Sequence, residues 1–476
     1  MTERFSAREA IALAGDDFRE LPVPMREFKP DGPLSWQGYD DSRRRALTRT
    51  GEDESVVCGT AVIGSTRAVL IAFEFGFLGG SLGERTGDRV EAAYTHARAH
   101  RLPVVSLVAT GGSRMQEGML ALTQLQRVAR QSALAREAGL PQIAVLRDPT
   151  TGGGWATLGA GADVTLALPG AQVGFAGSRV RPSDADPAAY TAEAQVAAGA
   201  VDAVVREEEL RETLALWLTL LTAPTAEGEG EAESESGGVA ETGGVAETEP
   251  ESEGEVEPVP PPAALGAPGL PATGWDAVRH ARSPERPRAA AYLDAYFSRR
   301  AAISGDRCGG SDDGMLCGFG SGPAGRTVAY AAQCGTATRP AGYRTAARLI
   351  RLAGRLGFPV LTLVDTPGAA NDAQAERQGA GSAIADLFAA VATARTPVTT
   401  LVIGEGGSGG ALALAAPGNT WSTPDSYFSV IAPELAAAIL KRPASEVRDT
   451  ADQLRIRPQD LVELGVIRGI VEHAGR

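Results

Sequence analysis

Short, almost continuous apolar runs alternate along the chain with longer segments of helical composition. Four such runs are bounded by proline or glycine, as buried parallel strands usually are: Val104–Ala109, Ile143–Leu146, Val360–Val364 and Val398–Ile403. Helices are expected between and after these runs, at residues 114–137, 155–162, 382–393 and 411–416. A strand, a crossover helix and a parallel strand form a right-handed unit, so the pattern predicts an α/β fold.

The two halves of the chain share one spacing of proline and glycine. The intervals are 9, 29 and 13 residues in each half. They separate Pro103, Gly112, Pro141 and Gly154 in the first half and, 256 residues later, Pro359, Gly368, Pro397 and Gly410. The apolar runs agree in type as well, since PVVSLVAT corresponds to PVLTLVDT. Equal intervals with matching runs between them predict an internal duplication.

A polar, acidic segment separates the two halves. Residues 226–258 contain twelve glutamates and no basic residue, and GGVAET occurs there twice in tandem. Such a segment buries too little apolar surface to offset its ordering entropy, so we predict a disordered tether at residues 223–275. This divides the chain into an N-terminal extension (1–44), a first domain (45–222) and a second domain (276–476).

Charge and hydropathy exclude several classes of protein. The net charge of −14 comes mostly from the acidic segment, so it says little about the catalytic surface. No basic or aromatic-interleaved face suggests nucleic-acid binding. No apolar run reaches the roughly 18 residues needed to span a membrane, and the charged N-terminus is unlike a signal peptide. We therefore expect a cytoplasmic enzyme without membrane or nucleic-acid partners.

The cysteines and histidines are too scattered to predict a metal site. No CxxC pair occurs among the four cysteines, and the four histidines are equally dispersed. A structural zinc site needs four closely converging ligands. We therefore expect no metal, and in particular no zinc.

Glycine-rich loops are the strongest candidates for chemistry. Four of them lie between a strand and a helix start, in duplicated register: Thr110–Ser113, Thr151–Gly154, Asp365–Gly368 and Gly404–Gly410. Glycine lets the backbone approach a ligand, and a helix N-terminus adds partial positive charge. One such loop is more often a tight turn, but four in register favour paired N–H donors for a developing oxyanion. Enolisation of a thioester needs such donors.

Other motif interpretations find less support. Residues 406–410 match the G-x-S-x-G elbow of serine hydrolases, with Asp425 or Asp449 and then His473 in the right order. However, His473 lies in a tail expected to fray. The DTPG run resembles a GTPase element, yet no GxxxxGK[ST] loop precedes it. GxGxxG is absent from the first-half loops, which disfavours dinucleotide binding.

Longer motifs carry a family resemblance. In the first half they are FEFGFLGGSLGERTGDRVEAA (73–93), TGGSRMQEGMLAL (110–122), DPTTGGG (148–154) and GFAGSRV (174–180). In the second half they are RPRAAAYL (286–293), GYRTAARLIRLA (342–353), DTPGAANDAQAERQG (365–379), VIGEGGSGGALAL (402–414) and YFSVIAPELAAAIL (427–440). The first set resembles the beta subunit of bacterial acetyl-CoA carboxylase carboxyltransferase, and the second resembles the alpha subunit. The chain is thus similar to a beta–alpha fusion.

The resemblance implies two crotonase-like (ClpP/crotonase) β-β-α superhelix domains. The family moves a carboxyl group from N-carboxybiotin to acetyl-CoA and gives malonyl-CoA. By motif, the thioester enolate would meet backbone N–H groups around Gly111, Gly112, Gly153 and Gly154. The ureido oxygen of biotin would meet those around Gly368, Gly409 and Gly410. Decarboxylated biotin can itself take the alpha proton, which would explain why no histidine or cysteine lies in the loops.

The resemblance also implies partners. No biotinyl-lysine motif occurs here, so biotin would arrive on a separate biotin carboxyl carrier protein. A separate biotin carboxylase would load it, since no ATP loop is evident. In this family the site lies between a beta-type and an alpha-type domain of different protomers. We therefore expect a homodimer that uses an acyl-CoA, the coenzyme A thioester, as substrate.

Three departures from the family pattern affect these expectations. A four-cysteine zinc ribbon is missing, the stretch after Val180 is short, and residues 334–344 replace a lysine-rich segment. Candidates for the CoA phosphate contacts are Arg85, Arg114 and Arg344, although composition alone favours a surface or fold-supporting role for each. A decarboxylase running the same half-reaction backwards and a degenerate scaffold remain alternatives. Acetyl-CoA and propionyl-CoA are not distinguished. Valine at Gly112 or Gly410 is expected to abolish transfer while the fold survives.

Overall fold

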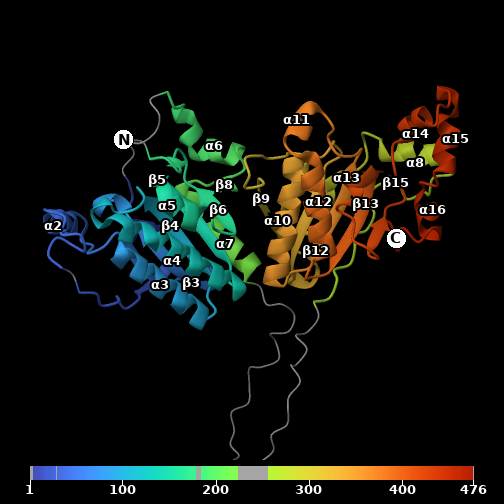
Figure 1. Cartoon of the computed structure of the whole chain (residues 1–476). Helices are drawn as coiled ribbons and strands as arrows, with labels where there is room; N and C mark the ends of the chain where they lie inside the picture. Colours follow the sequence, from blue (N-terminus) through green and yellow to red (C-terminus); the bar gives the residue numbers. More distant parts are fainter. Residues whose placement is uncertain (1–3, 28, 178–183, 223–255, 475–476) are drawn as a thin grey trace, which may run out of the picture.

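The computed structural model describes residues 4–27, 29–177, 184–222 and 256–474. Two α/β domains lie side by side, the first coloured blue to green and the second yellow to red (Figure 1). Each is built around one mixed sheet of eight strands. This architecture confirms the predicted α/β fold with two related domains.

The first sheet has the strand order β1-β2-β3-β4-β5-β6-β8, with β7 paired to the end of β5. Its strands β1 to β3 are antiparallel, and the rest run parallel. Their bounds are β1 (Asp16–Glu20), β2 (Val56–Ile63), β3 (Thr66–Phe73), β4 (Val104–Thr110), β5 (Gln142–Thr151), β6 (Val164–Ala167), β7 (Val173–Gly174) and β8 (Ala203–Val204).

The helices of the first domain are α1 (Ala7–Ala14), α2 (Tyr39–Thr50), α3 (Glu84–Ala99), α4 (Gly118–Glu137), α5 (Gly152–Gly154), α6 (Ala192–Ala197) and α7 (Glu207–Leu221). Of these, α3 and α4 connect successive parallel strands, whereas α1 precedes the sheet and α7 follows it. Short 3-10 or π turns are η1 (Leu78–Gly80), η2 (Met115–Glu117), η3 (Trp155–Gly159) and η4 (Pro187–Tyr190). The predicted helix at 114–137 therefore begins with a separate turn before α4.

The second sheet repeats this plan, with the order β16-β14-β13-β12-β11-β10-β9 and β15 paired to β13. Its strands are β9 (Arg299–Ile303), β10 (Met315–Ser321), β11 (Thr327–Gln333), β12 (Val360–Thr366), β13 (Val398–Gly407), β14 (Thr420–Ser422), β15 (Tyr427–Ser429) and β16 (Gly469–Ile470). The central strands β4 and β12 are buried along their whole length, as their continuous apolar sequences predict.

The helices of the second domain are α8 (Gly274–Ala281), α9 (Ala289–Tyr296), α10 (Pro340–Leu356), α11 (Ala373–Arg377), α12 (Ala380–Ala392), α13 (Ser408–Leu412), α14 (Pro433–Ile439), α15 (Val447–Gln453) and α16 (Pro458–Glu463), with turns η5 (Pro323–Gly325) and η6 (Ala444–Glu446). The sequence marks both ends of α10. Pro340 occupies its first turn, where no backbone donor is needed, and Gly357 caps it in the left-handed conformation with φ 76°.

The duplication extends to irregular details. The β4–β5 register breaks between Val108 and Thr110, and the β12–β13 register breaks between Val364 and Thr366. An isolated parallel bridge joins residues 82 and 113 in the first domain, and another joins residues 338 and 369 in the second. Both features recur 256 residues apart, so the internal duplication predicted from spacing is confirmed.

The two domains share a continuous core and a buried ionic contact. Trp217 from α7 meets Phe319 from β10 edge-on, with ring centroids 6.4 Å apart, within one apolar cluster. Asp202 is fully buried and accepts Arg307 Nη2 at 2.5 Å and Arg348 Nη2 at 3.0 Å. Burial of an ion pair with several hydrogen bonds fixes the relative placement of the groups that form it.

The predicted disordered tether needs a correction at its C-terminal end. Residues 223–255 lie outside the described part of the chain. Residues 256–275, however, pack on the second domain: Val259 and Ala264 are buried, and Thr399 Oγ1 donates to Val259 O at 2.7 Å. Ala264 N also donates to Glu472 O at 2.8 Å. Apolar residues and backbone hydrogen bonds therefore order this stretch despite its many prolines.

Two further observations concern only the described residues. None of their helices has the length and apolar character needed to cross a membrane. No group of three or more His, Cys, Asp and Glu side chains among them is arranged to hold a metal ion.

Candidate active site

The glycine loops of the first domain meet at the carboxyl ends of β4 and β5. Gly112 has φ 106°, a conformation that favours glycine, and its N–H donates to Thr110 Oγ1 at 3.0 Å. A methyl group built on Gly152 would lie only 3.0 Å from Gly112 Cα. The two loops therefore touch through their backbones, as the duplicated register predicts.

Helix α5 begins at the point where these loops meet. The first N–H groups of a helix have no partner within it, and they carry its partial positive charge. Gly153 and Gly154 lie in this first turn. A methyl group on Gly154 would overlap the Thr110 side chain, and one on Gly153 would overlap Leu125. Close packing thus requires glycine at both positions and holds their N–H groups in place.

One predicted donor is committed elsewhere. The Gly111 N–H donates to Gly79 O at 2.8 Å, so it holds η1 against the loop and is not available to a ligand. The Gly112 N–H is already bonded to a threonine hydroxyl, which a ligand oxygen would have to replace or share. In this structure the Gly111 N–H is therefore satisfied by a neighbouring loop, and Gly153 and Gly154 are the stronger candidates for donors.

The second domain has the same arrangement at the ends of β12 and β13. Gly368 has φ 141°, and its N–H donates to Thr366 Oγ1 at 3.1 Å. A methyl group on Gly410 would lie 2.5 Å from Ala369 N, so there is no room for a side chain there. Gly409 is different: a methyl group on it would meet nothing within 4 Å. The space before the first turn of α13 is therefore open to a ligand.

Ser408 does not have the surroundings of a hydrolase nucleophile. It adopts φ 55°, the left-handed conformation that Gly152 adopts at the equivalent place with φ 64°. Among the described residues, no histidine or carboxylate is hydrogen-bonded to its hydroxyl. His473 instead forms a backbone bridge with Ala264 at the edge of the domain. The G-x-S-x-G match is thus a consequence of the loop shape.

Arg114 is buried behind the first pair of loops. Its side chain is 1% exposed. Its Nη1 donates to Glu54 Oε2 at 3.1 Å and to Tyr39 Oη at 3.2 Å, and Tyr39 donates to Glu117 Oε1 at 2.5 Å. Burial acts to raise the pKa of Glu54, but the Arg114 guanidinium outweighs it and lowers that pKa to about 2. Every face of this guanidinium is occupied, so Arg114 supports the fold and has no room for a phosphate.

The other two arginines predicted to contact CoA are partly exposed. Arg85 lies 3.3 Å from Asp53, and burial lowers the pKa of Arg85. Arg344 Nε donates to Asp306 Oδ2 at 2.7 Å, and its Nη1 donates to Gln378 O at 3.0 Å. Their side chains are 20% and 24% exposed, so both keep some accessible surface. Arg85 and Arg114 both interact with Glu54 in the first domain, whereas Arg344 is bonded to Asp306 in the second.

A second buried pair, which sequence reasoning missed, lies behind the loops of the second domain. Asp365 is fully buried, and its Oδ1 accepts Arg286 Nη2 at 2.5 Å. Arg288 Nη1 lies 3.3 Å from Asp365 Oδ2. A signal was present, because a carboxylate ending the apolar run PVLTLVDT must find a cationic partner when the strand is buried. Only the fold shows that the partner is Arg286.

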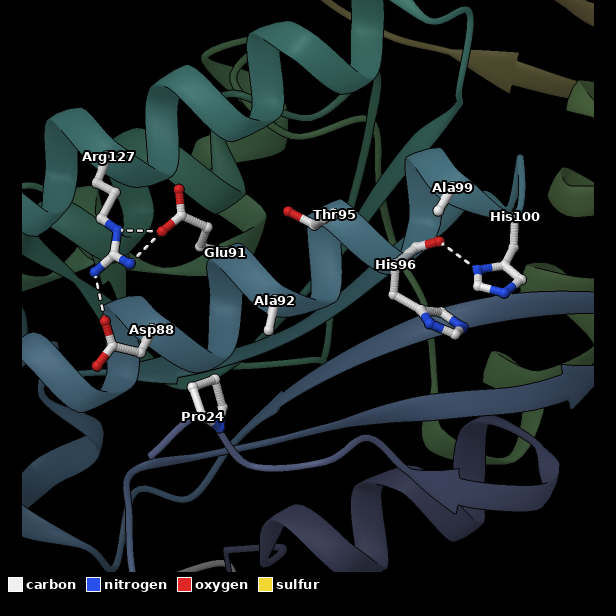
Figure 2. A pocket seen from close by; sticks show the side chains of 9 residues that line it. All are labelled: Pro24, Asp88, Glu91, Ala92, Thr95, His96, Ala99, His100 and Arg127. Atoms are coloured by element: carbon white, nitrogen blue, oxygen red, sulfur yellow. Dashed lines mark hydrogen bonds and ion pairs between the residues drawn. The ribbon is translucent and has the colours of Figure 1, made fainter. Parts of the chain in front are cut away.

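A cavity of about 510 Å³ opens on the outer face of α3, and no residue of the glycine loops lines it. Figure 2 shows Arg127 between Asp88 and Glu91, with His96 beside His100. Arg127 lies 2.7 Å from Asp88, and the two imidazole centroids are 4.0 Å apart. Its two carboxylates are paired with Arg127 and its two imidazoles stack on each other, so we assign the chemistry to the loops.

Comparison with known proteins identifies the family of the chain. A family model described as "Carboxyl transferase domain" matches residues 32–222, and one described as "Acetyl co-enzyme A carboxylase carboxyltransferase-like" matches residues 271–475. "Acetyl-coenzyme A carboxylase carboxyl transferase subunits beta/alpha" of Salinispora arenicola is 38% identical, over 98% of this chain and 81% of the relative. A "Probable biotin-dependent acyl-coenzyme A carboxylase beta3 subunit" of Mycobacterium tuberculosis is 33% identical, over 96% and 85%.

Solved structures show the same fold. Transcarboxylase 12S, crystallised with methylmalonyl-coenzyme A and methylmalonic acid, superposes with a TM-score of 0.74 at 19% identity, over 98% of this chain and 87% of that one. A single-chain, multi-domain long-chain acyl-CoA carboxylase gives 0.70 at 19% identity, over 98% and 46%. Sequence, duplication and loop geometry agree: the chain belongs to the acetyl-CoA carboxylase carboxyl transferase family, in the form that joins beta and alpha subunits in one polypeptide.

Proposed function

We propose that this protein transfers a carboxyl group from carboxybiotin, held on a biotin carboxyl carrier protein, to acetyl-CoA and so forms malonyl-CoA. The observation that carries the proposal is the pair of equivalent sites at which a glycine loop meets a helix N-terminus. Each site offers backbone N–H groups to one oxygen atom. The names of the beta/alpha relatives support the reaction and its substrate.

The chain's own contribution would be electrostatic. Enolisation of a thioester is difficult because negative charge develops on the carbonyl oxygen, and preorganised N–H donors stabilise that charge. In the first domain the donors are those of Gly153 and Gly154, with Gly112 shaping the opposite wall. In the second domain they are those of Gly409 and Gly410, with Gly368 in the equivalent place.

Biotin fits the second site on the evidence of space and polarity. The first N–H groups of a helix have no partner within it, and a methyl group on Gly409, in the first turn of α13, would meet nothing within 4 Å. When bound, carboxybiotin supplies the activated carboxyl group. The backbone of this domain would hold the ureido oxygen. A separate biotin carboxylase would reload the carrier, in keeping with the "biotin-dependent" name of the mycobacterial relative.

Exposed apolar side chains support a homodimer that completes the site. In the first domain Met115, Met119 and Phe175 are 75%, 67% and 72% exposed. Phe175 adjoins the loops, since its carbonyl accepts the Gly152 N–H at 3.0 Å. In the second domain further apolar side chains are exposed on and before α14: Val430, Leu435, Ile439 and Leu440. Exposed apolar groups gathered beside a site are typical of protein interfaces. We propose that the first domain of one copy faces the second domain of another.

The substrate could be larger than acetyl-CoA. The transcarboxylase neighbour was solved with methylmalonyl-coenzyme A. Arg85 and Arg344 are the candidates that could reach CoA phosphates, because both keep accessible surface.

A decarboxylase would use the same site in reverse. Intact loops in both domains argue against a scaffold without turnover.

The reverse reaction tests the proposal. Purified protein is mixed with malonyl-CoA and free biocytin, and release of acetyl-CoA is followed. We expect biocytin-dependent release. A folded protein that releases nothing from malonyl-CoA or methylmalonyl-CoA would overturn the proposal.

The loop glycines require a different variant from the one that the sequence suggests. Gly410→Val would collide with Ala369 N, so loss of activity there could reflect misfolding. At Gly409, by contrast, an added Cβ meets nothing within 4 Å, so Gly409→Val extends into open space. We expect Gly409→Val to lower the rate by about 100-fold or more with an unchanged thermal midpoint, because its side chain blocks the ligand oxygen from the backbone N–H groups, an effect comparable to losing an oxyanion donor. Gly381→Val, equally free of contacts but outside the loops, is the control.

A further inference from the structure

The loops of the second domain are held from behind by a buried pair. Arg286 is 3% exposed and Asp365 is fully buried, with 2.5 Å between Nη2 and Oδ1. Arg286 Nη1 also donates to Ile403 O at 3.2 Å, and its Nε donates to Ala281 O. The guanidinium thus connects β12, the end of β13 and α8.

Asp365 in turn bonds to the segments on either side of it. Its Oδ1 accepts the Glu405 N–H at 3.2 Å, and its carbonyl accepts the Gly335 N–H at 2.7 Å. A methyl group on Gly404 would overlap both Asp365 and Arg286. The loop that begins at Asp365 therefore packs closely against the loop that ends at Gly410.

The first domain lacks this device at the equivalent place. Counting 256 residues back from Asp365 gives Ala109, which has no polar side chain. There, the buried pair of Arg114 and Glu54, at positions that are not equivalent, lies behind the loops. The two halves, although duplicated, therefore support their loops with unrelated buried arginines.

We propose that Arg286 and Asp365 are positioning residues for the half-site in the second domain, acting through the Gly409 and Gly410 N–H groups. This rests on the proposed function, which assigns that half-site to biotin. Because the support behind the first domain is separate, loosening the Arg286 pair disturbs the biotin side and leaves acyl-CoA binding intact.

Arg286→Lys is the most informative change. Lysine keeps the positive charge but lacks the fork that reaches Asp365 and Ile403 O together. Arg288 stays near Asp365, so the carboxylate keeps a cationic neighbour and the fold is expected to survive. A displacement of the donors by about 1 Å costs up to about 100-fold in rate. We expect kcat/KM for biocytin to fall by about 10- to 100-fold, with the Kd of malonyl-CoA unchanged.

Two matched variants make the test selective. Arg114→Lys alters the equivalent support in the first domain, and we expect it to weaken malonyl-CoA binding while KM for biocytin changes little. Arg307→Lys alters a buried pair with Asp202 at the contact between domains, away from both loops. We expect it to lower the thermal midpoint without selectivity for either substrate. Equal effects of Arg286→Lys on both substrates, or none, would overturn the positioning role.

Amide exchange followed by mass spectrometry gives a readout that does not depend on turnover. In Arg286→Lys we expect faster exchange in the peptide covering residues 404–412 and unchanged exchange in the peptide covering 150–159. Unchanged exchange in both peptides would refute the positioning role even if the protein proved inactive. If the unmodified protein is itself inactive, faster exchange of the 404–412 peptide in Arg286→Lys would still support the positioning role, while the inactivity would reject the proposed reaction.

Discussion

At the scale of single residues, buried charges decide how the glycine loops are held. Arg114 was a candidate for contacting the CoA phosphates, yet it lies inside the domain beside Glu54. Such a pair must be fully hydrogen-bonded to offset the loss of hydration. Tyr39, from the segment predicted as an N-terminal extension, completes that bonding. The extension is thus part of the support for the first half-site.

The depressed pKa of Glu54 predicts how stability depends on pH. A carboxylate with a folded pKa of about 2 against an ordinary 4.5 contributes stability that is fully present above pH 4.5. That stability is lost as the pH falls from 4.5 towards 2. We expect Glu54→Gln to lower the free energy of unfolding at pH 7 by about 3 kcal/mol, because Arg114 loses its closest anionic partner.

Urea unfolding over a pH series checks this expectation. The Glu54→Gln variant should depend less on pH between 4.5 and 2 than the unmodified protein does. Asp17→Asn, at an exposed carboxylate, serves as the control and should follow the unmodified protein. Parallel pH curves for Glu54→Gln and the unmodified protein would show that this carboxylate is not stabilised by its surroundings.

At the scale of elements, helix ends and strand ends set where the loops lie. Helix α10 packs its apolar face against the sheet and ends at Gly357, after which the chain turns into β12. Strand β12 then leads directly into the loop of Gly368. The left-handed φ of 76° at Gly357 makes this turn tight. A helix that ended elsewhere would shift the start of β12, and with it the loop.

Two alanine substitutions in this helix should act in opposite directions. At Gly354, inside α10, a methyl group makes only an ordinary contact 3.4 Å from Arg395 Cβ. Gly354→Ala is expected to raise the free energy of unfolding by about 0.5 to 1 kcal/mol. Gly357→Ala is expected to lower it by about 1 to 2 kcal/mol, because alanine resists the left-handed conformation. Chemical denaturation measures both changes, and the same sign for both would contradict the assigned cap.

At the scale of the whole molecule, the contact between domains and the exposed apolar faces have different consequences. Asp202, Arg307 and Arg348 fix the two domains of one chain to each other. The apolar side chains beside the loops are largely exposed within the described part of the chain. The ionic contact therefore joins the two domains of one chain, and the exposed apolar side chains leave a surface that a second copy can cover.

Sedimentation analysis tests the proposed homodimer. We expect a mass of twice the chain at micromolar concentration. Ile439→Asp places a charge on a side chain that is 69% exposed, so the fold should persist while the dimer dissociates and transfer is lost. Met25→Asp, at a fully exposed side chain outside both faces, should leave dimer and activity unchanged. A monomeric but fully active protein would reject the shared site.

The sequence by itself determined the α/β class, the central strands, the duplication and the family. These follow from local periodicity, from fixed spacing and from motifs that are contiguous in the chain. It also placed Gly112 and Gly368 in tight turns, because such turns constrain residue type locally. It put the helices that follow the second loop of each domain at residues 155 and 411, whereas they begin at Gly152 and Ser408.

Tertiary structure alone decided the rest. Three interactions join residues far apart in the chain. The Gly111 N–H donates to Gly79 O, Arg114 pairs with Glu54, and Arg286 pairs with Asp365. Residues 256–275 are ordered for the same reason, since their partners lie on the sheet of the second domain. Composition describes a segment in isolation, whereas burial and pairing of a charge depend on what the fold brings beside it.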